Sequence, residues 1–184
     1  MRSIKNNLLN LCLVSCVLCP VLSGCGYTTS VVTRGNIQTI QVDIFKNKID
    51  ITKEVSAKDK YEIYVPDLEI DVRDAITERI FLDGHLKLAK KDSADSVLEG
   101  EIIEYRRDPL RYQDEDVIEY RISIACKIVL KKTKDSEVLL EEENIVGDST
   151  YFITGSLAKS ETEALKDATK DLARRIVNRI VENW

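Results

Sequence analysis

Few residues in this chain have the type and spacing needed for acid–base or nucleophilic chemistry. His85 is the single histidine, so any Ser–His or Cys–His pair would depend on it, and it follows Asp83-Gly84 in an expected turn. The seven glycines form no phosphate-binding loop, and the sequence has no Cys/His cluster with metal-ligand spacing. The acidic run Asp114–Asp116 is typical of a solvated loop. The sequence therefore predicts a non-enzymatic protein without a cofactor or a metal.

One segment has the residue types to bind an anionic amphiphile. Tyr105–Tyr112 contains Arg106, Arg107 and Arg111, with a tyrosine at each end. Guanidinium groups bind phosphate through two parallel hydrogen bonds, and aromatic rings can contact acyl or sugar surfaces. The alternative is a solvated hairpin tip, between two strands, in which these arginines pair with neighbouring acids.

Cys25 is distinguished from the other cysteines by its neighbours. Four of the five cysteines lie in the first 25 residues, which leaves Cys126 without a disulfide partner. A basic start precedes the uncharged apolar stretch 8–21, which as a helix would reach roughly 21 Å, short of the ~30 Å hydrocarbon core. Leu22-Ser23-Gly24-Cys25 then matches the bacterial lipobox, in which the cysteine thiol receives a diacylglyceryl group after cleavage.

Processing at this motif would divide the chain into three parts. Residues 1–24 are the signal peptide, residues 25–36 the lipidated N-terminus and a short tether, and residues 37–184 one folded domain. Gly26, not Asp, follows Cys25, which favours sorting to the outer membrane. Several acyl chains, including palmitate, anchor far more firmly than one. A plain secretory signal with a chance cysteine, or an uncleaved anchor, is the alternative.

Composition and charge exclude several classes of protein. The chain has 184 residues, with 43% hydrophobic and 32% charged, which is the mix of an ordinary packed domain. Removal of residues 1–24 leaves 25 Lys and Arg against 32 Asp and Glu, a net charge of −7. That sign argues against nucleic-acid binding.

Periodicity predicts the elements that must position these residues. Leu68, Val72, Ile76 and Ile80 form the apolar stripe of a helix over 67–82 that Gly84 ends. Strict alternation predicts a strand over 117–131, because every even position from 118 to 130 is apolar. Further strands are expected over 40–44, 86–105 (with a turn at 90–94) and 138–146. Ser160-x-x-Glu163 is a capping box that opens a final helix.

This order of elements predicts an α+β fold. Both helices are amphipathic and the longest strand has one polar face. We therefore expect two helices packed on one face of a mainly antiparallel, roughly four-stranded sheet. The other face of the sheet would be solvated or covered by a partner.

In order and spacing, the chain resembles the LptE family of lipopolysaccharide-assembly lipoproteins. The resemblance spans residues 22–184 and rests on the succession of elements more than on any single motif. The matching segments are Leu22–Tyr27, Ile40–Phe45, the helix over 67–82, Ala94–Ile102, Glu119–Ile122 and Leu157–Ser160.

The resemblance implies an outer-membrane lipoprotein on the periplasmic side, which plugs the lumen of an LptD-type β-barrel and helps deliver lipopolysaccharide. The family's lipopolysaccharide-contacting basic positions fall at Arg111 and Lys159. The match at Arg111 needs a two-residue length change, so Arg106 or Arg107 is an alternative. Lys131 and Lys132, at the next turn, are weaker candidates.

Two further points limit this interpretation. The acidic run 114–116 has no counterpart in the family and would oppose an anionic ligand. A related alternative is a periplasmic lipoprotein that activates a cell-wall synthase, but the tether of about eleven residues is short for crossing to the wall.

Overall fold

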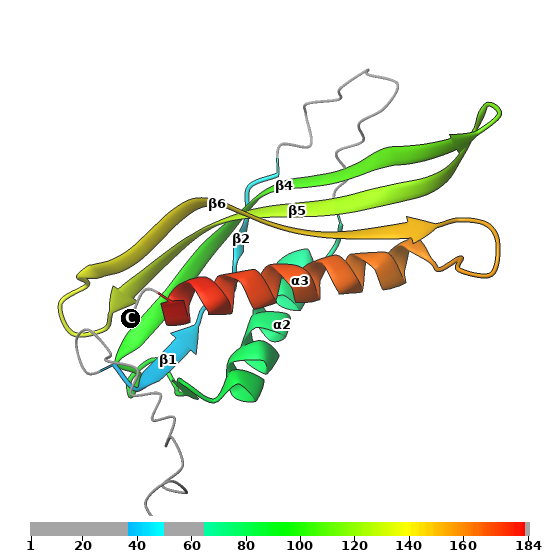
Figure 1. The fold of residues 1–184 in the computed structure, drawn as a ribbon. Coiled ribbons are helices and arrows are strands. Elements are labelled where there is room, and N and C mark those ends of the chain that lie inside the picture. The colour runs from blue at the N-terminus through cyan, green and yellow to red at the C-terminus, as the bar shows by residue number, and fades with distance from the viewer. Residues whose placement is uncertain (1–36, 50–64, 183–184) are drawn as a thin grey trace, which may run out of the picture. The chain divides into compact units, whose positions relative to one another are not determined.

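The computed structural model describes residues 37–49 and 65–182. Cys25, its lipobox, the tether and Trp184 lie outside the described residues. Eight helices and strands follow one another in the described part of the chain (Figure 1). They are β1 (Thr39–Val42), β2 (Lys46–Asn47), α2 (Leu68–Asp83), β3 (Lys87–Leu88), β4 (Ser96–Gln113), β5 (Asp116–Lys132), β6 (Val138–Phe152) and α3 (Glu161–Glu182).

The strands form one mixed sheet of six, in the order β3-β1-β4-β5-β6, with β2 beside β4. The long strands β4, β5 and β6 pair antiparallel, whereas β1 runs parallel to both β3 and β4, and β2 runs parallel to β4. The expectation of a four-stranded, mainly antiparallel sheet was therefore wrong in strand number and pairing. Strands of two residues are too short to show periodicity, and the crossover through α2 returns the chain parallel to β1.

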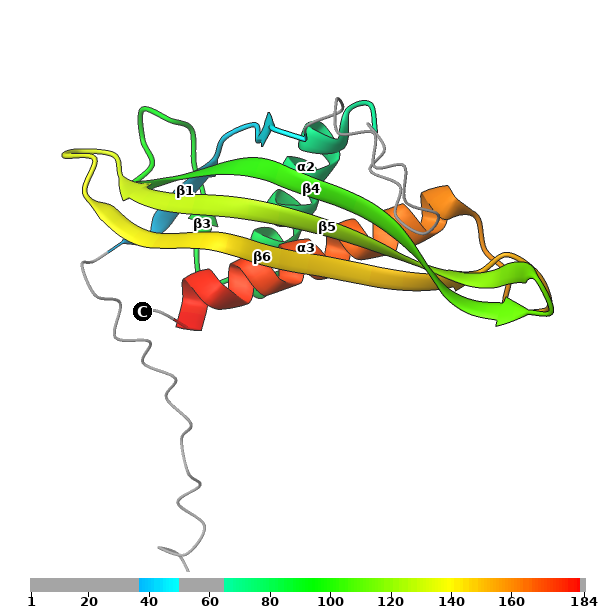
Figure 2. The same cartoon turned by 90° about the horizontal axis from the view of Figure 1, so that it is seen from above.

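Both helices lie on one side of this sheet, as the sequence predicted (Figure 2). In α2, Leu68, Val72, Ile76 and Ile80 are all at most 1% exposed, so the predicted stripe is confirmed. Gly84 has φ 77°, a left-handed conformation that suits glycine, and its N–H donates to the Ile80 carbonyl at 3.1 Å.

The predicted capping box opens α3. The backbone N–H of Ser160 donates to Glu163 Oε2 at 2.9 Å, and the N–H of Glu163 donates to Ser160 Oγ at 3.2 Å. Gly147 of β6 lets this helix approach the sheet closely, because a Cβ there would overlap the Leu172 backbone. The capping box therefore sets where α3 begins, and the close approach at Gly147 sets how near the helix lies to the sheet.

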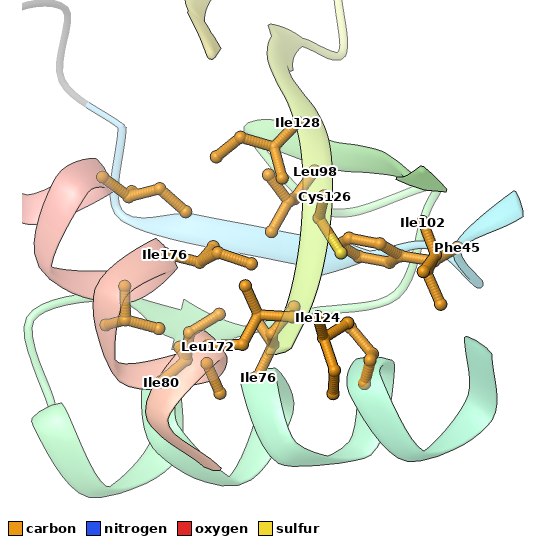
Figure 3. Packing of buried hydrophobic residues seen from close by; sticks show 14 of the residues in the cluster. Phe45, Ile76, Ile80, Leu98, Ile102, Ile124, Cys126, Ile128, Leu172 and Ile176 are labelled. Carbon is orange, nitrogen blue, oxygen red and sulfur yellow. The ribbon is translucent and has the colours of Figure 1, made fainter. Parts of the chain in front are cut away.

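A single core lies between the helices and the sheet (Figure 3). The alternation of β5 is confirmed, since its even positions from Ile122 to Leu130 are fully buried. Cys126 is among them, and burial raises the pKa of its thiol. The thiol is therefore a small apolar group in the core. In the described part of the chain, no helix is long and apolar enough to span a membrane.

Candidate functional site

The arginine-rich segment lies in strand and not in a loop. β4 continues through it to Gln113 and pairs with β5 along its whole length, so the turn holds only Asp114 and Glu115. Pro109 is accommodated beside an irregularity in the register between Pro109 and Arg111. Because side chains alternate along a strand, consecutive arginines point to opposite faces of the sheet.

We call the part of the molecule around this turn the distal end, defined as residues 104–121 and 148–163. It holds the four candidate cations Arg106, Arg107, Arg111 and Lys159. These segments contain five Lys and Arg against nine Asp and Glu, a net charge of −4.

Arg107 faces the helices and belongs to a partly buried cluster. Its Nη1 donates to Glu161 Oε2 at 2.6 Å, and its guanidinium lies 5.0 Å from the centre of the Tyr120 ring. The hydroxyls of Tyr105 and Tyr151 each donate to Glu161 at 3.4 Å. Burial, together with the Glu161 charge, raises the pKa of both phenols. This cluster connects the long hairpin to the first turn of α3.

Arg106 lies on the opposite, helix-free face. Its guanidinium forms ion pairs with Glu104 at 3.1 Å and with Asp108 at 3.7 Å. The two acids flank it at alternate positions of the same strand, and the Arg106 side chain is 26% exposed. The side chain is thus held between two carboxylates of its own strand.

Arg111 is the most accessible of the four candidates. Its side chain is 62% exposed, with Nε 3.4 Å from Glu119 Oε2. The guanidinium also lies 5.5 Å from the centre of the Phe152 ring, within range of a cation–π interaction. Leu110 and Tyr112, its neighbours in the chain, are 40% and 51% exposed.

Lys159 precedes α3 and is held by that helix. Its ammonium donates to Asp167 Oδ2 at 2.7 Å and to Ser149 Oγ at 3.4 Å, and its side chain is 29% exposed. Arg111 faces the helix-free side of the sheet. Lys159 contacts Ser149, which pairs with Ile122, a residue whose side chain faces the helices, so Lys159 lies on the helix side. The structure therefore brings these two cations to one end of the molecule but does not join them in one cluster.

The remaining candidates lie elsewhere. Lys131 and Lys132 are at the other end of the long strands, paired with Glu99 and Glu137. His85 is exposed and its Nδ1 lies 2.5 Å from Asp83 Oδ1. Within residues 37–49 and 65–182, no three His, Cys, Asp or Glu side chains are placed to hold a metal ion.

The acidic run forms the tip of the β4–β5 hairpin. Asp114 has φ 55°, the left-handed conformation of a tight turn. A hollow of about 690 Å³ lies beside the tip, between its carboxylates and a floor that includes Ile118, Tyr120 and Ile153. Sequence reasoning found the cations and the acidic run, and pairing of the arginines with neighbouring acids holds for Arg106 with Asp108. It missed the more distant carboxylates that Arg107, Arg111 and Lys159 contact. Arg107 and Glu161 are 54 positions apart, and no local pattern reports such a pair.

Several solved structures are similar to this chain. Solved structures similar to this chain include the rare lipoprotein B from Shewanella oneidensis, with 14% identity and a TM-score of 0.45 over 79% of this chain and 95% of that chain. The uncharacterized lipoprotein B from Nitrosomonas europaea has 16% identity and a TM-score of 0.46, over 79% of this chain and 83% of that chain. The hypothetical protein CT253 from Chlamydia trachomatis has 13% identity and a TM-score of 0.46, over 80% of this chain and 97% of that chain. No curated protein matches the chain.

The model of one family, described as LptE, lipopolysaccharide-assembly, matches residues 37–180. Within the described part of the chain, the match covers the six strands, α2, and α3 as far as Ile180. Since it spans well over half of the sequence, this chain belongs to the LptE family of outer-membrane lipoproteins that act in lipopolysaccharide assembly.

Proposed function

We propose that the chain is anchored through acyl chains on Cys25 to the periplasmic side of the outer membrane. There it plugs the lumen of an LptD-type β-barrel, assists the assembly of that barrel and helps deliver lipopolysaccharide to the outer leaflet. The role is non-catalytic. The family match over residues 37–180 carries this proposal, and the lipobox ending at Cys25 supports the anchor.

The helix-free face of the sheet has the polarity that a place in a barrel lumen requires. Lys127 bridges Glu141 and Glu143 at 2.9 and 2.6 Å, and Lys131 contacts Glu99 at 2.7 Å. The hydrogen bonds that the Lys127 ammonium donates to Glu143 and Glu141 raise its pKa. The interior of an outer-membrane barrel is polar, whereas its lipid-facing surface is apolar. These ion pairs fit the polar interior of a barrel and would be unfavourable against lipid.

We assign the lipopolysaccharide contact to Arg111 and Lys159, with Arg106 and Arg107 as alternatives. The exposure of Arg111 and its apolar neighbours Leu110 and Tyr112 support its part in this assignment, because lipopolysaccharide presents phosphate groups beside acyl chains. Arg107 is the least suited of the four to exchange partners, since its guanidinium is already held by Glu161 and Tyr120.

Affinity purification of the tagged mature lipoprotein from outer-membrane extract tests the partner. We expect an LptD-type barrel to be recovered in equal amount, and depletion of the lipoprotein to retain lipopolysaccharide in the periplasm. A matched pair of variants tests the surface. Lys127→Glu places a third acid beside Glu141 and Glu143 and is expected to reduce recovery of the barrel, while Lys166→Glu on the helix side is expected to leave it unchanged.

Two results would contradict the proposal. One is a lone monomer under every mild detergent condition. The other is recovery of a cell-wall synthase in place of a barrel. Mass spectrometry of the purified chain checks the anchor separately, since an unmodified Cys25 would remove that part alone.

A further inference from the structure

The end of the domain at which the described chain begins combines exposed apolar side chains with an excess of cations. We call it the proximal end, defined as residues 37–39, 79–96, 131–138 and 174–182. Its segments are joined by backbone hydrogen bonds from Lys87 N–H to Gln38 O and from Thr133 N–H to Asp95 O, both 2.9 Å. Figure 1 shows the start of β1, the β5–β6 turn and the end of α3 together, far from the β4–β5 turn.

Two large apolar side chains protrude from this end. Phe81 and Leu82, in the last turn of α2, are 76% and 68% exposed. They lie outside the buried stripe that includes Ile80, so packing against the sheet does not require them. Leu88 and Val138 at the same end are 39% and 51% exposed. Large apolar side chains exposed side by side, as Phe81 and Leu82 are, indicate contact with a partner or a membrane.

The charge of the proximal end selects between these two kinds of contact. Its segments hold ten Lys and Arg against six Asp and Glu, a net charge of +4 in a chain whose mature net charge is −7. Lys87 and Lys90 form no ion pair with any residue in the described part of the chain. Cations near a bilayer are attracted by anionic headgroups, by about 1 kcal/mol for each Lys or Arg close to the surface.

The length of chain between the lipobox and the fold keeps this end near a bilayer. Residue 37 follows Cys25 by twelve positions. Twelve residues span at most about 43 Å even when fully extended. Acyl chains on Cys25 would therefore hold residue 37, which immediately precedes Gln38 and its contact with Lys87, within that distance of the membrane.

We propose that the proximal end binds the phospholipid surface directly. Phe81 and Leu82 enter the boundary between headgroups and acyl chains, and the lysines of the end face anionic headgroups. This proposal rests on the proposed anchoring at Cys25 and adds an orientation to it. The β4–β5 hairpin then runs from the periplasmic leaflet into the lumen of the proposed barrel, so the distal end with Arg111 is presented to partners there. The acyl chains hold the chain at the membrane, and a second contact fixes the orientation of the domain.

A pair of labelled variants tests the orientation in the intact lipoprotein. Cys126 is fully buried, and an acylated Cys25 has no free thiol, so one introduced cysteine can carry an environment-sensitive dye. We compare Leu82→Cys with Leu157→Cys, whose native side chains are 68% and 75% exposed at opposite ends. The acylated chain is reconstituted into vesicles of phosphatidylethanolamine and phosphatidylglycerol. Dye at position 82 should shift to the blue and be quenched by lipid-borne quenchers, whereas dye at position 157 should behave as in water. Equal accessibility at the two positions would overturn the proposal.

A second experiment removes the dependence on acylation. The mature chain with Cys25→Ala, exported by an ordinary signal peptide, is floated with the same vesicles. We expect weak binding that falls in high salt or with neutral lipid. Binding should drop about tenfold in the Phe81→Ser/Leu82→Ser variant, because two apolar side chains are lost from the interface. The matched variant Ile153→Ser/Leu157→Ser, at exposed apolar positions of the distal end, should bind like the parent.

The two proposals fail in different ways. No flotation of the parent chain, or equal losses in the proximal and distal variants, would overturn the membrane contact even if Cys25 is acylated. An unmodified Cys25 with intact flotation would overturn the anchor and leave the membrane contact standing. Circular dichroism of each variant confirms that the fold is retained.

Discussion

The proximal and distal ends of this domain expose equal numbers of large apolar side chains but carry opposite charge. Four large apolar side chains are exposed at each end, namely Phe81, Leu82, Leu88 and Val138 against Leu110, Tyr112, Ile153 and Leu157. The proximal segments have a net charge of +4 and the distal segments −4. Apolar exposure alone would assign both ends the same kind of ligand. The charge separates them, because only the proximal end attracts an anionic surface as a whole.

The same comparison sharpens the role of the distal cations. Each of Arg106, Arg107, Arg111 and Lys159 contacts a carboxylate, and the acidic tip adds further negative charge. An anionic ligand there must exchange with a bound carboxylate, so its specificity would come from single well-placed contacts. We infer that contacts at this end are local and that long-range attraction contributes little.

The largest effect on stability is expected from displacing α3, the long helix that runs between the two ends. In Gly147→Val, the added side chain overlaps the Leu172 backbone, so α3 must move away from β6. We expect a loss of about 3 kcal/mol or more in the free energy of unfolding, measured by urea denaturation. Thr150→Val, at an exposed position of the same strand, should change stability by less than about 0.5 kcal/mol. Equal stabilities would show that α3 does not need this close approach.

The next effect concerns the distal end alone. Glu161→Gln removes the charge that Arg107 contacts and weakens the acceptor of two tyrosine hydroxyls. We expect a loss of about 2 kcal/mol, because the partly buried Arg107 loses the charge of Glu161 and two tyrosine hydroxyls lose an ionised acceptor. Amide hydrogen exchange should accelerate in 105–121 and remain unchanged at the proximal end. Glu104→Gln is the control, since Arg106 retains Asp108. Faster exchange at both ends would mean that the cluster is not a local connection.

How much of this molecule the sequence predicts depends on the range over which a pattern acts. The stripe of α2, the capping box of α3 and the alternation of β5 are local, and all three were confirmed. β6 was expected to end at Val146, yet it continues to Phe152 through the polar run Gly147-Asp148-Ser149-Thr150, which has no alternation. The distal half of β4 was missed because Asp108 and Pro109 are typical of turns.

Long-range contacts account for what the sequence could not predict in the candidate site. The four cations were found by type and position. Arg106 pairs with acids of its own strand, but the partners of the other three follow from the register of the hairpin and from the path of α3. One signal was available and unused. Phe81 and Leu82 are large apolar residues outside the period-four stripe of α2, and such residues at a helix end indicate an exposed apolar surface.

A smaller effect is expected on ligand binding at the distal end. In the double variant Arg111→Asp/Lys159→Asp, each position loses a cation and gains an acid beside an existing carboxylate. We expect binding of lipopolysaccharide to weaken about fivefold, since exposed ion pairs are worth roughly 1 kcal/mol or less. Circular dichroism should be unchanged. Lys131→Asp/Lys132→Asp is the matched pair at the other end, and an equal loss there would mean that binding follows overall charge and not these positions.

The smallest effect concerns how β1 is held at the proximal end. Asp95 Oδ2 accepts hydrogen bonds from the Gln38 and Thr39 N–H groups at 3.0 Å and from Thr39 Oγ1 at 2.7 Å. The Thr39 hydroxyl, these backbone donors and the charge of Lys134 lower the pKa of Asp95. Asp95→Ala should cost about 0.5 to 1 kcal/mol at neutral pH, whereas Asp92→Ala should cost less.

The pH dependence of the stability lost in Asp95→Ala tests the role of the carboxylate directly. Because the folded chain binds the Asp95 proton less readily than the unfolded chain, this stabilisation is complete above the unfolded pKa of about 3.9. It is lost as the pH falls through the lower folded value. Urea unfolding of the parent and of Asp95→Ala should therefore differ at pH 6 and converge in acid. A difference that persists below both pKa values would show that the neutral side chain, not the carboxylate, holds β1 at the point where the chain enters the fold.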